Sequence, residues 1–265
     1  MPFEIPVQIQ SLSVIVMVAL VIIGLERRFP YDHGQKFFRK GFWNDFVMYS
    51  IVQSAVLGLV IGRIIEWIDS TSGLSRLHLV SSWPVWGQFL FFFVVHDLYI
   101  YWFHRLQHSN KYLWRVHEAH HSVQEIDWVA GSRSHSIEIL INQTIEFAPI
   151  LLLGAAPEIA VWKGCLDAVW GMWIHSNVGV RTGFLQYVLN GPEMHRWHHA
   201  EEVPIPGCNF STKIAIWDWI FGTAHLPRDR KPRSYGLGAG EGFPENYLLQ
   251  HTAMFRPFEQ VEDES

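Results

Sequence analysis

The chain has 265 residues, of which 49% are apolar, 18 are Phe and 13 are Trp, and its mean hydropathy is +0.09. This composition favours a membrane protein, and the length fits one large domain or two small ones. The net charge of −5 and the pI near 6.3 give no support to nucleic-acid binding, because no basic run with interleaved aromatic residues is present.

Three apolar runs in the first part of the chain predict membrane helices, at residues 9–25, 46–65 and 83–103. Each is close to the length that a helix needs to cross a bilayer. The first run lacks a basic segment before it and a small-residue cleavage site after it, so a membrane helix is favoured over a cleaved signal peptide. The third run contains His96 and Asp97, and ionisable residues at that depth need a paired or functional role.

Two further apolar stretches, at residues 137–162 and 165–180, predict a broken hairpin, because Pro149, Gly154 and Pro157 interrupt the first of them. Hydropathy leaves open whether this hairpin spans the membrane or re-enters it from one side. Beyond Arg181 the chain has the Pro, Gly and charge content of a soluble segment.

Basic residues are distributed unevenly among the connections. Residues 1–8 have no Lys or Arg, and residues 66–82 have only Arg76, whereas residues 26–45 have five. The positive-inside rule therefore predicts an external amino terminus and histidine-rich segments on the cytoplasmic side. The carboxyl end lacks a dilysine signal, which favours a bacterial inner membrane over the endoplasmic reticulum.

Histidines recur at helical spacing in the second half of the chain. The pattern His-x-x-His-His occurs twice, and a His-x-x-x-His pair precedes it; together these supply His104, His108, His117, His120, His121, His195, His198 and His199. Residues at i, i+3 and i+4 share one helix face, so each triplet can serve one metal or be divided between two. Eight imidazoles exceed the three or four ligands of a tetrahedral zinc site, so the sequence predicts two metal ions.

Two other histidines are candidate ligands. His175 ends an apolar run, where an unpaired ring would be costly to bury, and His135 follows the second box. For both, a hydrogen-bonded core histidine is the alternative. The acids expected to orient rings or offset charge are Asp97, Glu118, Glu138 and Glu193, with ordinary surface carboxylates as the alternative.

These boxes, in this order, closely resemble the fatty acid hydroxylase and sterol desaturase superfamily of integral-membrane di-iron enzymes. The segment from Arg133 to Glu138 is similar to the family's Arg-x-His-Pro-x-Glu, with Ser136 in place of the proline. The segment from Trp217 to Thr223 resembles the family's Trp-Asp-x-x-Phe-Gly-Thr, and Ser211 replaces a usual glycine after Asn209-Phe210. The resemblance covers residues 90–225, about half of the chain.

The resemblance implies an all-α, multi-pass transmembrane bundle of about four membrane helices or hairpins with a cytoplasmic helical cap that carries the dimetal site. It also implies two Fe ions, which Zn can replace on purification, with O₂ as co-substrate and a sterol-like or fatty-acyl lipid as the substrate. It divides the chain into N-terminal membrane helices (1–82), a catalytic domain (83–225) and a cytoplasmic tail (226–265). The family's ligand-bearing histidine between the second and third boxes supports His175.

The sequence leaves the reaction open between hydroxylation and desaturation, because both begin with the same hydrogen abstraction. No Gly-x-Gly-x-x-Gly fingerprint or haem-binding segment is present, so electrons are expected from a separate cytochrome b5-like protein or a ferredoxin and its reductase.

Two alternatives use the same histidines. His117-Glu118-x-x-His121 also matches a zinc metalloprotease motif with Glu118 as the general base, although this reading leaves the other boxes without a role. A metal transporter or sensor would distribute ionisable residues along a membrane path, whereas these clusters lie at helix ends and in cytoplasmic segments.

Overall fold

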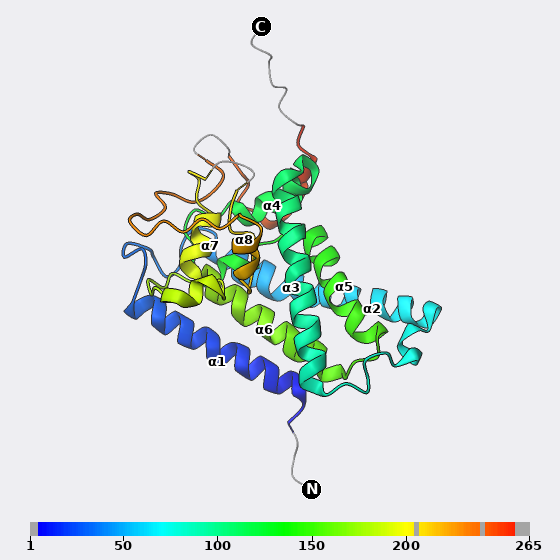
Figure 1. Cartoon of the computed structure of the whole chain (residues 1–265). Coiled ribbons are helices and arrows are strands. Elements are labelled where there is room, and N and C mark those ends of the chain that lie inside the picture. The colour runs from blue at the N-terminus through cyan, green and yellow to red at the C-terminus, as the bar shows by residue number, and fades with distance from the viewer. Residues whose placement is uncertain (1–4, 204–206, 239–241, 258–265) are drawn as a thin grey trace.

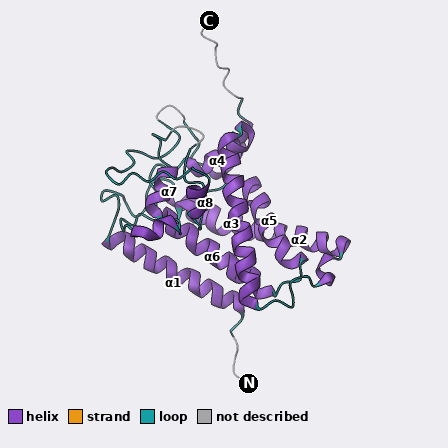
Figure 2. Cartoon of the chain, in the orientation of Figure 1, coloured by secondary structure: helices purple, strands orange, loops and turns teal. Residues whose placement is uncertain are grey.

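The computed structural model describes residues 5–203, 207–238 and 242–257, and in this part of the chain all regular structure is helical (Figures 1 and 2). The longer elements are α1 (Val7–Arg28), η1 (Asn44–Gln53), α2 (Ser54–Ser72), α3 (Val85–Ser109), α4 (Lys111–His121), α5 (Ser136–Leu152) and α6 (Pro157–His175). The shorter ones are η2 (Leu74–Leu77), η3 (Ala130–Ser132), η4 (Gly183–Tyr187), α7 (Pro192–His198), α8 (Ile216–Ile220), α9 (Tyr247–Thr252) and η5 (Ala253–Phe255). The helical fold class is confirmed.

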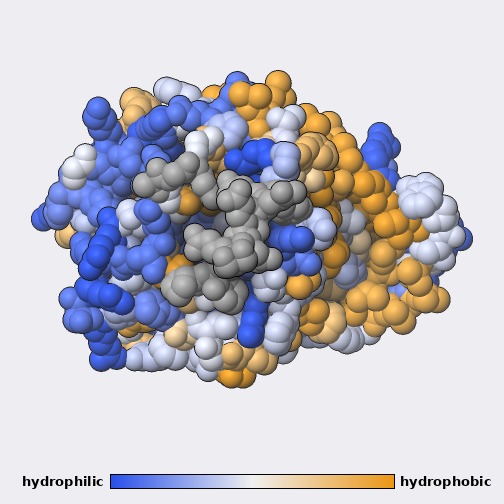
Figure 3. All heavy atoms as spheres, turned by 90° about the horizontal axis from the view of Figure 1, so that it is seen from above, coloured by the Kyte–Doolittle hydropathy of each residue, from blue (hydrophilic) through white to orange (hydrophobic). Residues whose placement is uncertain are grey.

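Two helices are long and apolar enough to cross a membrane, namely α1 and the continuous helix formed by η1 and α2 (Asn44–Ser72). Their apolar side chains are largely exposed, with only 11% and 17% of the two hydrophobic windows buried. Figure 3 shows hydrophobic side chains gathered on the side of the molecule where α2 lies in Figure 1, and hydrophilic side chains on the opposite side. An apolar surface of this extent is typical of contact with lipid.

Helices α3, α5 and α6 pack against one another and form the centre of the fold, with α1 against α6 and α2 against α5 (Figure 1). Apolar contacts fill the space between these helices away from the histidines, where Phe92, Ile150 and Ile159 are buried together with Val80. A second cluster joins α2 to α5 through Ile61, Ile65 and Ala148. This packing holds α3 and α6 so that their carboxyl ends lie near the amino end of α5.

The hairpin is broken in the part of the first apolar stretch where Gly154 and Pro157 predicted an interruption. The gap at residues 163–164 between the two predicted stretches is not a boundary, because α6 runs without interruption from Pro157 to His175. The chain turns instead at residues 153–156, where Gly154 has a positive φ of 74° and Pro157 begins the next helix. Proline at the first helical position lacks only an N–H that would have no partner in the helix, so it starts α6 and does not break it.

The turn between α3 and α4 brings the first two histidine boxes together. Asn110 has extended backbone angles, and its side chain accepts hydrogen bonds from the backbone N–H groups of Tyr112 (2.9 Å) and Leu113 (3.1 Å). This asparagine therefore ends α3 and caps α4, because it satisfies two of the amide groups that a new helix leaves without partners. The reversal places the last turn of α3 beside the inner face of α4.

Candidate metal centre

Nine buried histidines form two neighbouring groups that could each hold a metal ion. The first contains His104, His108, His117, His121 and His198, and the second contains His120, His175, His195 and His199. Within each group the candidate ligand atoms all lie within 4.8 Å of one another. The groups are adjacent, since the rings of His121 and His199 have centroids 4.5 Å apart. The structure thus brings together the eight histidines of the boxes and His175.

Helix periodicity explains how each triplet is divided. In α4, His117 and His121 lie in the first group, while His120 lies in the second. At the end of α7 the assignment is reversed, because His195 and His199 lie in the second group and His198 lies in the first. The i and i+4 residues lie nearly above one another on a helix, whereas i+3 is rotated to the side, so each triplet serves both groups.

Five of the rings have Nδ1 fixed by an acceptor outside the two groups. Backbone carbonyls accept from His104 (Phe210, 2.8 Å), His120 (Arg133, 3.0 Å), His175 (Gly171, 2.8 Å) and His198 (Cys208, 2.7 Å), and the Glu138 carboxylate accepts from His117 (2.9 Å). A neutral imidazole with its proton on Nδ1 has a free lone pair on Nε2. Metal-binding histidines almost always have this kind of partner.

These protonation states leave nitrogen lone pairs facing one another. The Nε2 atoms of His104 and His117 are 3.1 Å apart, and those of His120 and His175 are 3.3 Å apart. Neither ring in these pairs has a proton on Nε2, so the two nitrogens repel each other unless a cation lies between them. The donor set therefore fits metal ions.

Burial keeps the imidazoles in the form that binds metals. It lowers the pKa of His117 to about 3 and that of His120 to about 4, from an ordinary value near 6.5. It also holds the pKa values of His195, His198 and His199 well below that value, and the neighbouring histidines lower them further. At neutral pH these rings are uncharged, as ligation requires.

A glycine that the sequence analysis missed makes room for His175. A Cβ atom on Gly131 would lie 2.5 Å from Nδ1 of that histidine, closer than nonbonded atoms approach. Gly131 belongs to η3, in the loop after the second box. No periodic pattern marks it, because the requirement comes from a helix more than forty residues further along the chain.

The four acids proposed to support the site have different positions. Glu138 contacts His117, as described above. Asp97 accepts hydrogen bonds from the backbone N–H groups of Lys213 (3.2 Å) and Ile214 (3.0 Å), and Glu193 pairs with Arg181 (3.1 Å). Of the four, Glu138 is therefore the one that contacts a histidine of the two groups.

Glu118 provides evidence against the protease reading. Its carboxylate pairs with Arg115 (3.2 Å) and Arg256 (2.9 Å), although the flanking His117 and His121 are both in the first group. A general base has to reach the water or substrate at the metal, and these ion pairs hold the carboxylate elsewhere.

His135 lies outside both groups. Its Nδ1 accepts from the backbone N–H of Ile137 (3.1 Å) at the start of α5, and its Nε2 contacts the carbonyl oxygen of His251 (3.1 Å). The structure does not bring this candidate ligand to the other nine. His135 instead has the position of a hydrogen-bonded core histidine, which was the alternative interpretation of this residue.

A cavity of about 210 Å³ opens against the two groups. The side chains of His104, His117, His120, His175 and His195 line it, together with Glu138 and the apolar residues Ile100, Ile139 and Ile174. A substrate in this cavity would lie against both candidate metal positions.

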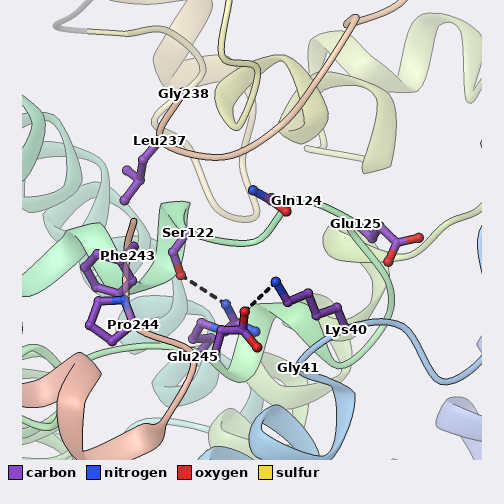
Figure 4. Close-up of a pocket in the computed structure, with 11 residues that line it drawn as sticks. Lys40, Gly41, Ser122, Gln124, Glu125, Leu237, Gly238, Phe243, Pro244 and Glu245 are labelled. Atoms are coloured by element: carbon purple, nitrogen blue, oxygen red, sulfur yellow. Dashed lines mark hydrogen bonds and ion pairs between the residues drawn. The ribbon is translucent and has the colours of Figure 1, made fainter. Parts of the chain in front are cut away.

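A separate cavity of about 220 Å³ lies near the surface and is crossed by an ion pair between Lys40 and Glu245 (Figure 4). Ser122 and Arg133 also line it and are joined by a hydrogen bond of 3.0 Å. None of the nine histidines lines this second cavity.

Comparison with known proteins identifies relatives along most of the chain. The family model described as fatty acid hydroxylase matches residues 89–223. An ornithine lipid hydroxylase of Rhizobium tropici is 29% identical over 245 residues, which cover 90% of this chain and 73% of the relative.

Other relatives match the central part of the chain. The alkylglycerol monooxygenase of Homo sapiens is 30% identical over 53% of this chain and 31% of its own length. A very-long-chain aldehyde decarbonylase of Oryza sativa subsp. indica is 30% identical over 56% of this chain and 58% of its own length. The chain thus spans about a third of that monooxygenase. No solved structure gives a significant match.

Proposed function

This chain belongs to the fatty acid hydroxylase family, and from that premise we propose that it is a membrane di-iron oxidoreductase that uses O₂ to hydroxylate or desaturate a C–H bond of a lipid. The observation that carries the proposal is the two buried groups of histidines, which share one cavity. Relatives named as an ornithine lipid hydroxylase and an alkylglycerol monooxygenase support lipid oxidation.

Iron suits both the ligands and the reaction. Imidazole nitrogen binds Fe, Cu, Ni and Zn, whereas oxygen ligands are preferred by Mg and Ca. Zinc has no redox chemistry, and an unactivated lipid C–H bond requires an oxidant. We therefore assign one iron to the group that contains His104 and His117, and one to the group that contains His120 and His175. When bound, this pair supplies O₂ activation.

The reaction balances with an external reductant. In hydroxylation one oxygen atom enters the C–H bond, and the other leaves as water after the uptake of two electrons and two protons. In desaturation two hydrogens leave the lipid and both oxygen atoms leave as water, again with two electrons from the donor. We propose a cytochrome b5-like protein or a ferredoxin with its reductase as that donor, since the chain has no dinucleotide-binding fingerprint.

The residues of the chain position the reactants. The carbonyl and carboxylate partners of the Nδ1 atoms hold the imidazoles with Nε2 toward the metals. Ile100, Ile139 and Ile174 give the cavity an apolar wall that favours a lipid carbon over water beside the centre.

Topology and domain limits are part of the proposal. We place the membrane helices in residues 1–82, the catalytic domain in 83–225 and a cytoplasmic tail in 226–265, with about four membrane segments in total. The centre then faces the cytoplasm of a bacterial inner membrane, in agreement with the Lys and Arg of residues 26–45.

Metal analysis of purified protein, combined with lipid analysis of cells that express it, tests the proposal. We expect about two irons per chain, because nine ligands exceed the three or four of one zinc site. We also expect an oxidised lipid that is absent when His120→Ala is expressed and present with the control His33→Ala, whose side chain is exposed. A single zinc, with peptide cleavage that depends on Glu118, would contradict the proposal.

A further inference from the structure

Residues 133–138, which we call the support segment, orient one histidine in each of the two groups. At the start of the segment, the carbonyl oxygen of Arg133 accepts from Nδ1 of His120 (3.0 Å), which belongs to the second group. At its end, the carboxylate of Glu138 accepts from Nδ1 of His117 (2.9 Å), which belongs to the first group. The conformation of this one segment therefore affects both candidate metal positions.

The middle of the support segment contacts the short helix α9, which lies beyond residue 223, where the match to the family model ends. The backbone N–H of Ser136 donates to Nε2 of His251 (3.0 Å), and the Ser136 hydroxyl oxygen lies 2.7 Å from the same nitrogen. From the other side, Nε2 of His135 contacts the carbonyl oxygen of His251 (3.1 Å). One residue of α9 thus contacts two neighbouring residues of the segment.

The hydrogen bonds fix the position of the proton on both rings. Nδ1 of His251 lies 2.9 Å from the carbonyl oxygen of Tyr247, which can only accept, so Nε2 has a free lone pair for Ser136. Nδ1 of His135 accepts from the N–H of Ile137, so its proton lies on Nε2 and points to the carbonyl of His251. Each ring nitrogen therefore has a partner, and the contact between the two histidines is directional.

These contacts cap the amino end of α5. Ser136 and Ile137 are the first two residues of this helix, and their N–H groups have no acceptor within it. The rings of His251 and His135 supply the two acceptors. Glu138 lies in the same first turn. The two rings therefore hold the turn that presents the Glu138 carboxylate to the first group of histidines.

Side chains of η1 hold α9 in place. The side chain of Gln250 is buried, and its oxygen accepts from the hydroxyl of Tyr49 (2.7 Å). The hydroxyl of Tyr247 donates to the side-chain oxygen of Gln53 (2.8 Å), whose amide donates to the carbonyl of Ser134 (2.9 Å). Helix α9 therefore reaches the support segment both directly, through His251, and through Gln53.

The contact between Ser136 and His251 does not have the arrangement of a hydrolytic pair. A nucleophilic serine needs a base that is free to take its proton and space for a substrate. Here Nε2 of His251 already accepts from a backbone N–H, and neither residue lines the cavity beside the metal centre or the one near Lys40. The contact is better explained by the position of the backbone that it holds.

We propose that α9 positions the ligands of both metals through the support segment, with His251 as the positioning residue. Its contacts with Ser136 and His135 keep the segment in the conformation in which Arg133 and Glu138 both face the centre. Metal binding and the docking of α9 are then coupled, and each strengthens the other by the same factor. This inference rests on the proposed function, because it requires that the two groups bind metal.

His251→Ala tests the inference on the full chain in detergent micelles. Affinity for iron(II) is measured without oxygen, by competition with a graded chelator. It should fall about tenfold, the smaller of the effects usual for partners of ligating histidines, because His251 acts through the segment and not by contact with a ligand. Both metal positions should weaken, since Arg133 and Glu138 each serve one group.

Tyr49→Phe is the matched control. It removes the hydrogen bond to Gln250, the neighbour of His251 on α9, and leaves the contacts of His251 with the support segment in place. Each variant loses a hydrogen bond of α9, so each should lower the thermal midpoint of the metal-free protein. Only His251→Ala should weaken iron binding. Equal iron affinities in the two variants would overturn the inference.

Ser136→Pro, added to His251→Ala, provides a rescue that loss of stability alone does not predict. Proline fixes φ near −65° and favours an extended residue before it, and it is well tolerated at the first position of a helix. Ser136 has that position, and His135 before it has φ −63° and ψ 141°. Covalent geometry then imposes what the hydrogen bonds held, and most of the lost affinity should return. Iron binding as weak as in His251→Ala would overturn the inference.

Hydrogen exchange measures the coupling from the side of α9. Iron(II) should slow exchange of the backbone N–H groups of α9 and of Ser136 in the native protein, and should have less effect on them in His251→Ala. Unchanged exchange in native α9 on saturation with iron would overturn the inference.

The outcomes separate this inference from the proposed function. A native protein that binds two irons, with an unaltered affinity in His251→Ala, would overturn the inference alone. Two bound irons without oxidation of any lipid, with electrons supplied, would overturn the proposed function alone, since the affinities still decide the role of α9. A native protein that binds no metal would overturn both.

Discussion

The imidazoles of the centre are oriented by what their other nitrogen contacts. Four of the five acceptors are backbone carbonyls, and the fifth is Glu138, the one acceptor that a side-chain substitution removes. Its carboxylate also brings negative charge close to two groups of neutral imidazoles that could each hold a cation.

Glu138→Gln tests this support at the residue scale. We expect about 10- to 100-fold weaker iron binding, as is usual when a partner of a ligating histidine is changed. Iron retained after dialysis against a graded chelator measures the effect. Glu118→Gln is the matched control, since that buried carboxylate neighbours His117 but contacts arginines. Equal losses of iron in both variants would show that Glu138 has no special role.

Gly131→Ala tests the close approach to His175. The added methyl would meet Nδ1 at 2.5 Å, so the ring must rotate and lose its hydrogen bond to Gly171. We expect the iron content to fall toward one per chain, because the affected histidine belongs to the second group. Gly62→Ala, which meets nothing within 4 Å, is the control. An unchanged iron content in Gly131→Ala would show that the site tolerates the movement.

At the scale of elements, the ends of the helices position the histidines of the metal centre. His104 and His108 lie in the last two turns of α3, and the first triplet, His117, His120 and His121, lies in the last two turns of α4. Asn110 alone separates the two helices, and its side chain caps the second. The angle between these helices therefore depends on one polar residue.

Asn110→Ala should destabilise the start of α4. Loss of an N-cap costs about 0.5–2 kcal/mol, and the thermal midpoint of the detergent-solubilised protein should fall. Asn110→Ser retains an acceptor and should recover most of the loss, which separates capping from the size of the side chain. If serine and alanine behaved alike, the cap would not control this turn.

At the scale of the whole molecule, the metal centre is a common contact of α3, α4, α6 and α7. The nine histidines are buried at this point, two pairs of them with facing lone pairs, and the apolar faces of α1 and α2 lie outside. Bound metals would therefore stabilise the assembly of helices as well as supply chemistry.

Removal of the metal should lower the thermal midpoint of unfolding and make the stability of the protein depend on pH. Folding lowers the pKa of His117 to about 3 and of His120 to about 4, so between these values and 6.5 the unfolded chain binds more protons than the folded one. Stability of the metal-free protein should thus be retained above pH 6.5 and fall as the pH drops toward 4. Thermal scans from pH 8 to 4, with and without chelator, check this. A pH-independent midpoint without metal would contradict it.

The helical fold class, the membrane character and the histidine boxes could be predicted from the sequence, because residue type and spacing along a helix are local properties. His175 was also predicted, since a polar ring at the end of an apolar run requires a partner. The position of His135 could not be predicted, because its spacing is compatible with either a ligand or a hydrogen-bonded core histidine, and only the packing of α9 beside it distinguishes the two.

By itself, the sequence determined which side chains could bind metals, since the i, i+3 and i+4 positions place imidazoles on one face of any helix that contains them. The tertiary structure decided how the triplets divide between two groups, where the turn before α6 lies, and that Gly131 must lack a side chain. It also decided that His96, Glu146 and Asp167 meet around the ammonium of Lys163. Each of these depends on the relative rotation and packing of helices that are distant in sequence, and no local pattern encodes that.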